Sequence, residues 1–176
     1  TQSSAASDVY KRQLLKQVGI NPIVIHGGGP RIKKMLDRLK VKSSFVDGLR
    51  VTDKETMDIV EMVLSGSINK EIVMEINKEG GMAIGLSGKD ALLTKPKKFE
   101  KKKATGEVEK ILDLGFVGLP SKINTDFLKW CIQTEFIPVI SPIGYGEKFE
   151  TYNINADTMS GAISASILSE RLILLT

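Results

Sequence analysis

The sequence has little of the chemistry on which metal sites, disulfides and hydrolytic triads depend. Its 176 residues include one histidine and one cysteine. The lone Cys131 excludes a disulfide within the chain, and with His26 as the single imidazole we expect no metal site built from histidine and cysteine. A hydrolase triad is also disfavoured, because His26 would have to act as the base from within a glycine-rich turn.

Long apolar runs are absent as well. No stretch reaches the roughly 18 residues that a membrane span needs, and no basic start followed by an apolar stretch indicates a secretory signal. We therefore expect no membrane partner. Residues 1–13 are rich in serine and alanine and then basic, with no periodicity that would bury a face. We set this segment apart as an unmatched tail, which could be disordered, part of a transit segment or a cloning remnant.

The excess of positive charge comes from one stretch of the chain. Lysine and arginine number 25 against 21 aspartates and glutamates, a net charge of +4. Six lysines lie between Lys95 and Lys103, and Phe99 is the one aromatic residue among them. Proteins that bind single-stranded nucleic acid interleave aromatic and basic residues. The pattern therefore favours a solvated, lysine-rich loop and no nucleic-acid partner.

Strand-like and helix-like segments alternate from residue 14 onward, which is typical of a parallel sheet covered by helices. A short helical stripe at 14–18 comes first. The pattern then predicts helices over 31–39, 53–64, 68–78, 125–134 and 156–169, and strands over 23–25, 82–86, 92–94, 111–117, 137–140 and 172–175. Asp47-Gly48 predicts a small hairpin, Thr52 and Glu55 fit a capping box, and 65–67 should separate two helices. We expect Asn155 to cap the helix that follows it.

Three successive glycines follow the first of these strands and open a helix. The backbone N–H groups of Gly27, Gly28 and Gly29 can bind phosphate oxygens, and the helix dipole adds positive potential there. The spacing is neither G-x-G-x-x-G nor the Walker motif. Asp47 lies where a dinucleotide-binding fold places its ribose-binding acid, but it belongs to an Asp-Gly turn. A tight turn without a ligand stays an alternative.

Four further polar residues are candidates for a site. Arg50, at the base of the hairpin, could bind a carboxylate through two N–H groups, although a surface arginine would show the same pattern. Asn153 and Asn155 point to one side of an extended segment, and Asp157 falls in the first turn of the next helix. Helix capping by Asn155, with Asp157 facing the dipole, is the alternative reading.

Seven segments, in this order, resemble the acetylglutamate kinases of the amino acid kinase family. They are VIHGGGP at 24–30, GLRVT at 48–52, INKEIV at 68–73, GLSGKD at 85–90, PVISPIG at 138–144, YNINAD at 152–157 and LILLT at 172–176. The resemblance covers residues 23–176. It implies an α/β fold, a three-layer αβα sandwich with a mainly parallel central sheet, in which residues 14–176 would form the N-terminal, substrate-binding half. It also implies a homodimer or homohexamer in the cytoplasm, a plastid or another organelle.

The activity that the resemblance implies is ATP-dependent phosphorylation of the side-chain carboxylate of N-acetyl-L-glutamate, with Mg2+, in the second step of arginine biosynthesis. By matching position, Gly28 and Gly29 would bind the phosphoryl group and the substrate. Arg50 and Asn153 would hold acetylglutamate, and Asp157 would orient the catalytic lysines.

The family pattern also has parts that find no match in this chain. They are a first strand that carries one catalytic lysine, and the ATP-binding half that carries the other. We therefore expect the chain to be a fragment that is inactive alone. Two alternatives stay open: a non-catalytic amino-acid-binding or regulatory domain of the same fold, and a dinucleotide-binding oxidoreductase domain.

Overall fold

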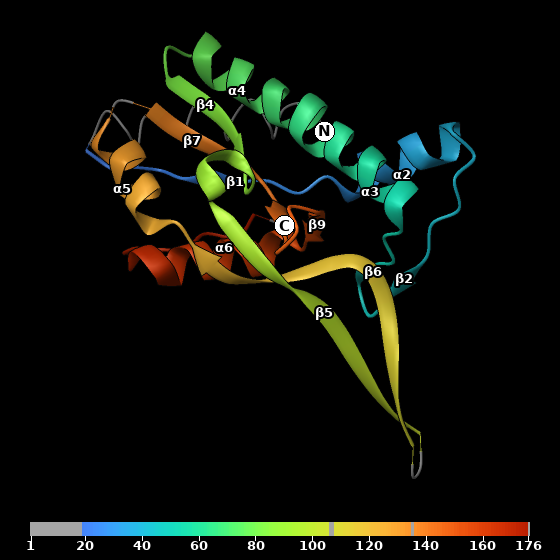
Figure 1. The fold of residues 1–176 in the computed structure, drawn as a ribbon. Helices are drawn as coiled ribbons and strands as arrows, with labels where there is room; N and C mark the ends of the chain where they lie inside the picture. Colours follow the sequence, from blue (N-terminus) through green and yellow to red (C-terminus); the bar gives the residue numbers. More distant parts are fainter. Residues whose placement is uncertain (1–18, 106–107, 135, 176) are drawn as a thin grey trace.

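The computed structural model describes residues 19–105, 108–134 and 136–175 (Figure 1). The segment 1–13 and the helical stripe expected at 14–18 lie outside the described residues. In chain order the elements are β1 (Val24–Ile25), α2 (Gly29–Arg38), β2 (Phe45–Val46), β3 (Leu49–Arg50), α3 (Lys54–Glu61), the π-helical segment η1 (Met62–Ile68), α4 (Asn69–Lys78), β4 (Met82–Ser87), the 3-10 turn η2 (Asp90–Leu92), β5 (Thr94–Thr105), β6 (Val108–Ile123), α5 (Thr125–Gln133), β7 (Phe136–Ser141), β8 (Ile143–Tyr145), β9 (Thr151–Ile154) and α6 (Ala156–Ile167).

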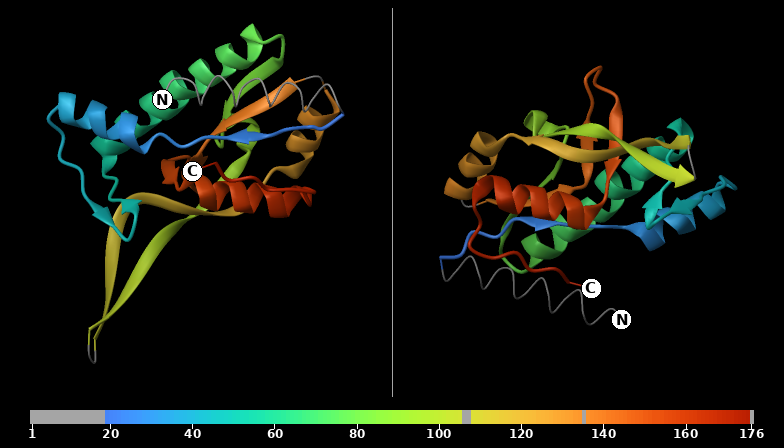
Figure 2. Two further views of the ribbon diagram at one scale, coloured as in Figure 1. Left: turned by 180° about the vertical axis from the view of Figure 1, so that it is seen from behind. Right: turned by 90° about the horizontal axis from the view of Figure 1, so that it is seen from below.

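A three-stranded parallel sheet, in the order β1–β7–β4, forms the centre of the fold. Adjacent residues of β7 face different helical layers, because side chains alternate along a strand. Val139 lies in a buried cluster with Ile76 of α4, whereas Ile140 lies in one with Leu128 of α5 and Met159 of α6. Helices therefore cover both faces of the sheet (Figure 2), as the expected αβα layering requires.

A second sheet, in the order β5–β6–β9–β8, is mostly antiparallel, with β6 and β9 as its parallel pair. β5 and β6 form a long hairpin that projects from the body of the molecule (Figures 1 and 2). The prediction of a lysine-rich loop is therefore wrong, because residues 95–103 belong to β5, and the strand expected at 111–117 lies inside β6. Pairing with β6 satisfies the backbone of β5 whatever its side chains are. Lys95 and Lys98 form exposed ion pairs with Glu147 and Asp113.

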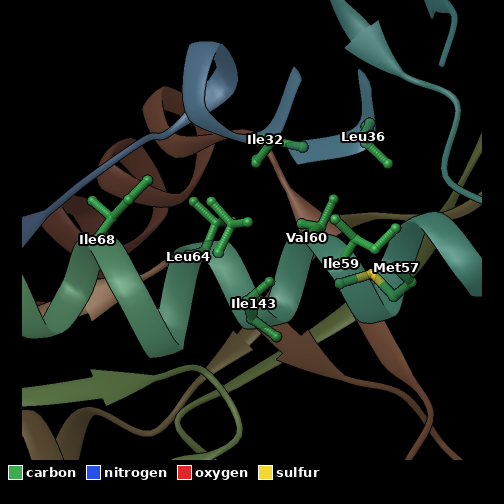
Figure 3. Close-up of a cluster of buried hydrophobic side chains, with 9 residues drawn as sticks. Ile32, Leu36, Met57, Ile59, Val60, Leu64, Ile68 and Ile143 are labelled. Atoms are coloured by element: carbon green, nitrogen blue, oxygen red, sulfur yellow. The ribbon is translucent and has the colours of Figure 1, made fainter. Parts of the chain in front are cut away.

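The helices expected on either side of 65–67 are one continuous helix, formed by α3, η1 and α4 without a break. The prediction of a separating turn is wrong because the helix is held by tertiary packing, which outweighs the low helix propensity of Gly66. Leu64 and Ile68 in the π-helical segment are buried in one cluster with Ile32 and Leu36 of α2 (Figure 3). Buried apolar residues on one face of the helix therefore continue through the segment in which the composition of 65–67 predicts a break.

Asp53 caps α3, and the predicted capping box at Thr52 is not formed. The carboxylate of Asp53 accepts a hydrogen bond of 2.8 Å from the backbone N–H of Thr56, while the Thr52 side chain is buried and bonds elsewhere. Asn155 caps α6, as predicted, and Asn124 caps α5 in the same way. The Asp-Gly hairpin is also confirmed, with β2 antiparallel to β3.

Two predicted strands differ from the structure. Residues 172–175 form no strand within the described part of the chain, and their side chains are exposed. Their β-prone composition is insufficient because a strand needs a neighbouring backbone to pair with. The strand expected at 92–94 starts only at Thr94, after η2. Among the described residues, no helix is long and apolar enough to cross a membrane.

Candidate functional site

The glycine turn lies where the sequence places it, between β1 and α2. Gly28 is the N-cap residue of α2, and Pro30 lies in the first turn, where its missing N–H is not needed. No side chain among the described residues caps this helix. The N-terminal N–H groups of α2 are thus not used by a side-chain cap, and such groups, with the helix dipole, favour an anion.

Arg50 is the buried cation of the site. It is 6% exposed, at the end of β3. Its guanidinium donates to the carbonyl oxygen of Gly29 at 3.3 Å and to the hydroxyl of Ser43, and lies 4.5 Å from the centre of the Phe45 ring. Burial lowers the pKa of Arg50, and the charge of Asp37 opposes this shift. The surface-arginine alternative is therefore wrong, and the structure holds a desolvated cation beside the glycine turn.

Asn153 joins the same site through Thr52. The Thr52 hydroxyl, fully buried, donates to the carbonyl oxygen of Arg50 at 2.8 Å and accepts from Asn153 Nδ2 at 3.3 Å. The Thr52 backbone is bonded on both sides to β6, through Leu114 and Phe116. Sequence reasoning missed this role, because the spacing to Glu55 directed attention to a helix cap.

Asp157 lies in the first turn of α6 and is exposed. The start of α6 faces the glycine turn, since a Cβ placed on Gly27 would lie 3.7 Å from the Cβ of Ala156. Asn155 accepts a hydrogen bond of 2.9 Å from the N–H of Thr158, so its capping role is confirmed. The carboxylate of Asp157, two residues after Asn155, forms no hydrogen bond or ion pair with the described residues.

Gly28 and Gly29 differ in their surroundings. A Cβ on Gly28 would overlap the side chains of Ile68 and Leu64, 2.7 Å from the latter; Figure 3 shows both side chains on the same side of their helix. A Cβ on Gly29 would meet nothing within 4 Å. Packing therefore suffices to explain Gly28, whereas the open space beside Gly29 is available to a ligand.

Behind the turn lies a buried polar pair that the sequence analysis did not single out. His26 is 8% exposed and Asn69, at the start of α4, is 1% exposed. The signal available in the sequence was an asparagine between Ile68 and Ile72 on the apolar side of a helix, because such an amide must find buried partners.

Two of the clefts formed by the described residues bear on the site. One, of about 840 Å3, is lined by Lys33, Lys40, Lys42, Phe45 and Arg50 among others, a predominantly cationic set that suits an anionic ligand. The other, of about 590 Å3, lies between η1 and the end of β4 and includes none of the predicted site residues. Within the described part of the chain, no group of three histidine, cysteine, aspartate or glutamate side chains is placed to hold a metal ion.

Comparison with known proteins places the chain in a family. The sequence model of the amino acid kinase family matches residues 9–176. The chain belongs to this family. The match starts inside the segment 1–13 and runs to the last residue of the chain. It favours the amino acid kinase fold over the dinucleotide-binding alternative.

Curated relatives include acetylglutamate kinases. The chain is 59% identical over 165 residues to that of Rhodospirillum centenum, covering 93% of this chain and 54% of the relative. It is 53% identical over 175 residues to that of Ehrlichia canis, covering 98% of this chain and 54% of the relative. The chain thus spans about half the length of these relatives, and the resemblance to acetylglutamate kinases is confirmed.

Solved structures share the fold. The structure of smu.665 from Streptococcus mutans UA159 has a TM-score of 0.80 at 25% identity and covers 97% of this chain and 64% of its own. An N-acetylglutamate synthase from Neisseria gonorrhoeae has a TM-score of 0.76 at 17% identity, over 99% of this chain and 40% of its own. The second likeness supports the fold alone.

Proposed function

We propose that this chain is the substrate-binding half of an acetylglutamate kinase, which uses ATP to phosphorylate the side-chain carboxylate of N-acetyl-L-glutamate. The observation that carries the proposal is the hydrogen bond from the buried guanidinium of Arg50 to Gly29, in a chain that is 53% and 59% identical to two acetylglutamate kinases. This hydrogen bond places a buried cation beside a turn whose backbone N–H groups can bind an anion.

Arg50 and Asn153 would hold acetylglutamate. A guanidinium forms charge-assisted hydrogen bonds with a carboxylate, and the amide of Asn153 supplies both a donor and an acceptor. The nucleophile, a carboxylate, is already ionised at pH 7. No general base is needed, so the work of the protein is alignment and neutralisation of spread negative charge.

The backbone N–H groups of Gly27, Gly28 and Gly29 would face the transferring phosphoryl group. The open space at Gly29 and the N-terminus of α2, which lacks a side-chain cap among the described residues, fit a phosphate there. Mg2+ would enter with ATP and offset the charge of its phosphates. Asp157 would orient the catalytic lysines, which the resemblance assigns to a first strand and an ATP-binding half not matched in this chain.

The complete protein would be a homodimer or homohexamer, in the cytoplasm or in a plastid or other organelle. β4 is one of the two edge strands of the central sheet among the described residues. Met82 on β4, with Met62 and Met74 on the adjoining helix, is more than half exposed. Such an edge and its apolar neighbours would suit a second copy of the chain.

A second candidate is a non-catalytic amino-acid-binding domain. It is favoured by the buried guanidinium of Arg50 beside Gly29, which would bind the carboxylate of an amino acid without any transfer of a phosphoryl group. The test is the trapping of the acyl phosphate with hydroxylamine, in the presence of ATP and acetylglutamate. We expect hydroxamate from the complete protein and none from this chain alone.

The other outcomes separate the candidates. A complete protein that binds acetylglutamate but forms no hydroxamate would support the binding domain. Hydroxamate formed by this chain at a rate near that of the complete protein would show that the catalytic lysines have been misplaced.

A further inference from the structure

The residue that precedes the glycine turn contacts the turn's own backbone. His26 Nδ1 lies 3.0 Å from the carbonyl oxygen of Gly27, and His26 Nε2 lies 3.2 Å from Nδ2 of Asn69. Both side chains are buried. The imidazole therefore lies between the turn, on one side, and the start of α4, on the other.

The partners of Asn69 decide which ring nitrogen of His26 carries the proton. Asn69 Nδ2 lies 2.8 Å from the carbonyl oxygen of Val139 and 3.3 Å from that of Leu86, and Asn69 Oδ1 accepts from Lys70 Nζ at 3.3 Å. Carbonyl oxygens only accept, so the amide NH2 must face them. The two amide hydrogens are then shared among these carbonyl oxygens and His26 Nε2, and because a protonated Nε2 would point its own hydrogen at them, Nε2 is the accepting nitrogen.

A neutral imidazole has one donor and one acceptor nitrogen. With Nε2 as acceptor, the proton is on Nδ1, and it is donated to the carbonyl oxygen of Gly27. We propose that His26, oriented by Asn69, is a positioning residue that holds the Gly27 carbonyl toward the ring. This inference rests on the proposed phosphate-binding role of the turn.

The physical reason lies in the mobility and charge of a glycine turn. Glycine has little conformational preference of its own, so a peptide between two glycines can rotate unless it is restrained. A rotated peptide would present its carbonyl oxygen, the negative end of its dipole, to the phosphoryl group. Binding of Gly27 O to the imidazole proton prevents this and keeps the N–H groups available to the anion.

The same helix restrains the next residue of the turn by packing. Leu64 and Ile68, on η1, fill the space where a Cβ of Gly28 would lie. Asn69 follows directly and reaches His26. One stretch of helix thus fixes two successive residues of the turn. Leu64 and Ile68 pack against Gly28, and Asn69 holds the carbonyl of Gly27 through the imidazole of His26. π-Helical segments recur at functional sites. The contacts of η1 with the glycine turn would account for the π-helical segment in this fold.

Two variants, which differ in side-chain length by one methylene group, distinguish the roles of the two ring nitrogens. In H26N the side-chain NH2 can take the place of Nδ1 and donate to Gly27, whereas in H26Q the polar group reaches toward Asn69 instead. In the complete kinase we expect kcat to fall less than about threefold in H26N. In H26Q we expect a fall of about tenfold to 100-fold, the cost of a reacting group misplaced by about 1 Å. The KM for acetylglutamate should change less than about twofold in both.

Equal losses of kcat in the two variants, in step with equal losses of thermal stability, would overturn the inference and leave His26 a packing residue. A second measurement does not depend on the variants being active. In protein labelled with 15N-histidine, the imidazole signal absent from H26N identifies His26, and its nitrogen shifts should show the neutral Nδ1–H tautomer. The Nε2–H tautomer would also overturn the inference. If the wild-type complete protein lacks kinase activity but shows the Nδ1–H tautomer, the proposed function fails while the arrangement of His26 stands.

Discussion

The guanidinium of Arg50 donates a hydrogen bond of 3.3 Å to the carbonyl oxygen of Gly29, 21 residues earlier in the chain. This bond joins the base of the β2–β3 hairpin to the glycine turn. Two sources of positive potential, a buried guanidinium and the N-terminus of α2, therefore lie side by side. Both favour the same kind of ligand, an anion.

Replacement of Arg50 by alanine should weaken the binding of acetylglutamate by about 1.5–3 kcal/mol, the range for hydrogen bonds to charged groups. Titration calorimetry on the complete protein measures it. Arg31 offers a matched control, because its exposed guanidinium is bonded to Glu71 and Ser67 on the surface. R31A should leave the affinity as it is. An R50A variant with wild-type affinity would remove Arg50 from the substrate site.

Gly28 and Gly29 should respond differently to alanine. A Cβ at Gly28 overlaps Leu64 and Ile68, so G28A should lower the free energy of unfolding by about 1–3 kcal/mol, as overpacking does. A Cβ at Gly29 has open space. G29A should leave the stability near that of the wild type and raise the KM for ATP. Denaturant unfolding and steady-state kinetics of both variants test this, and equal destabilisation of the two would show that the turn serves packing alone.

Asp157 should matter for activity and little for stability. D157N in the complete protein should lower the kcat of the proposed reaction by at least about 100-fold, since preorganised charges of this kind supply a large share of the rate. Asp126 is the matched control, because it occupies the same second position of α5 after the cap Asn124. D126N removes the same helix-dipole interaction, of about 0.3–1 kcal/mol, and should retain activity. Similar kcat values in the two variants would contradict a catalytic role for Asp157.

The cap of α3 should make part of the stability depend on pH. The hydrogen bond from the backbone of Thr56 lowers the pKa of Asp53. A carboxyl whose pKa is lower in the folded state stabilises the fold above its unfolded pKa of about 3.9, and this contribution is lost as the pH falls through the lower, folded value. D53N keeps a capping acceptor but does not titrate.

The difference in unfolding free energy between the wild type and D53N should therefore be constant above about pH 5 and shift against the wild type below about pH 4. Denaturant midpoints measured from pH 7 to pH 3 provide the comparison. A difference that stays the same over this range would show that Asp53 is not the group responsible.

Features that depend on a few neighbouring residues could be predicted from the sequence. The cap residues Asn124 and Asn155 bond to N–H groups three residues away. The Asp47-Gly48 turn depends on positive φ angles at both positions, which these residue types tolerate. The central strands were recognisable as short apolar runs, because a strand buried on both faces has no polar positions. The seven segments that resemble acetylglutamate kinases also identified the family, since residue types at fixed spacing do not depend on coordinates.

Other features depend on partners that are distant in the chain. The lysines of 95–103 form a strand because β6 supplies a backbone to pair with, and the helix continues through 65–67 because α2 packs against it. Thr52 bonds to Asn153, 101 residues away, and Asn69 reaches His26 across 43 residues. Neither pair has a local signature, because a buried polar group is satisfied by whatever donor or acceptor the fold brings to it. Periodicity and spacing thus predicted many of the elements and indicated candidate site residues, while tertiary packing decided which of those residues are buried, which are exposed and what holds the glycine turn in place.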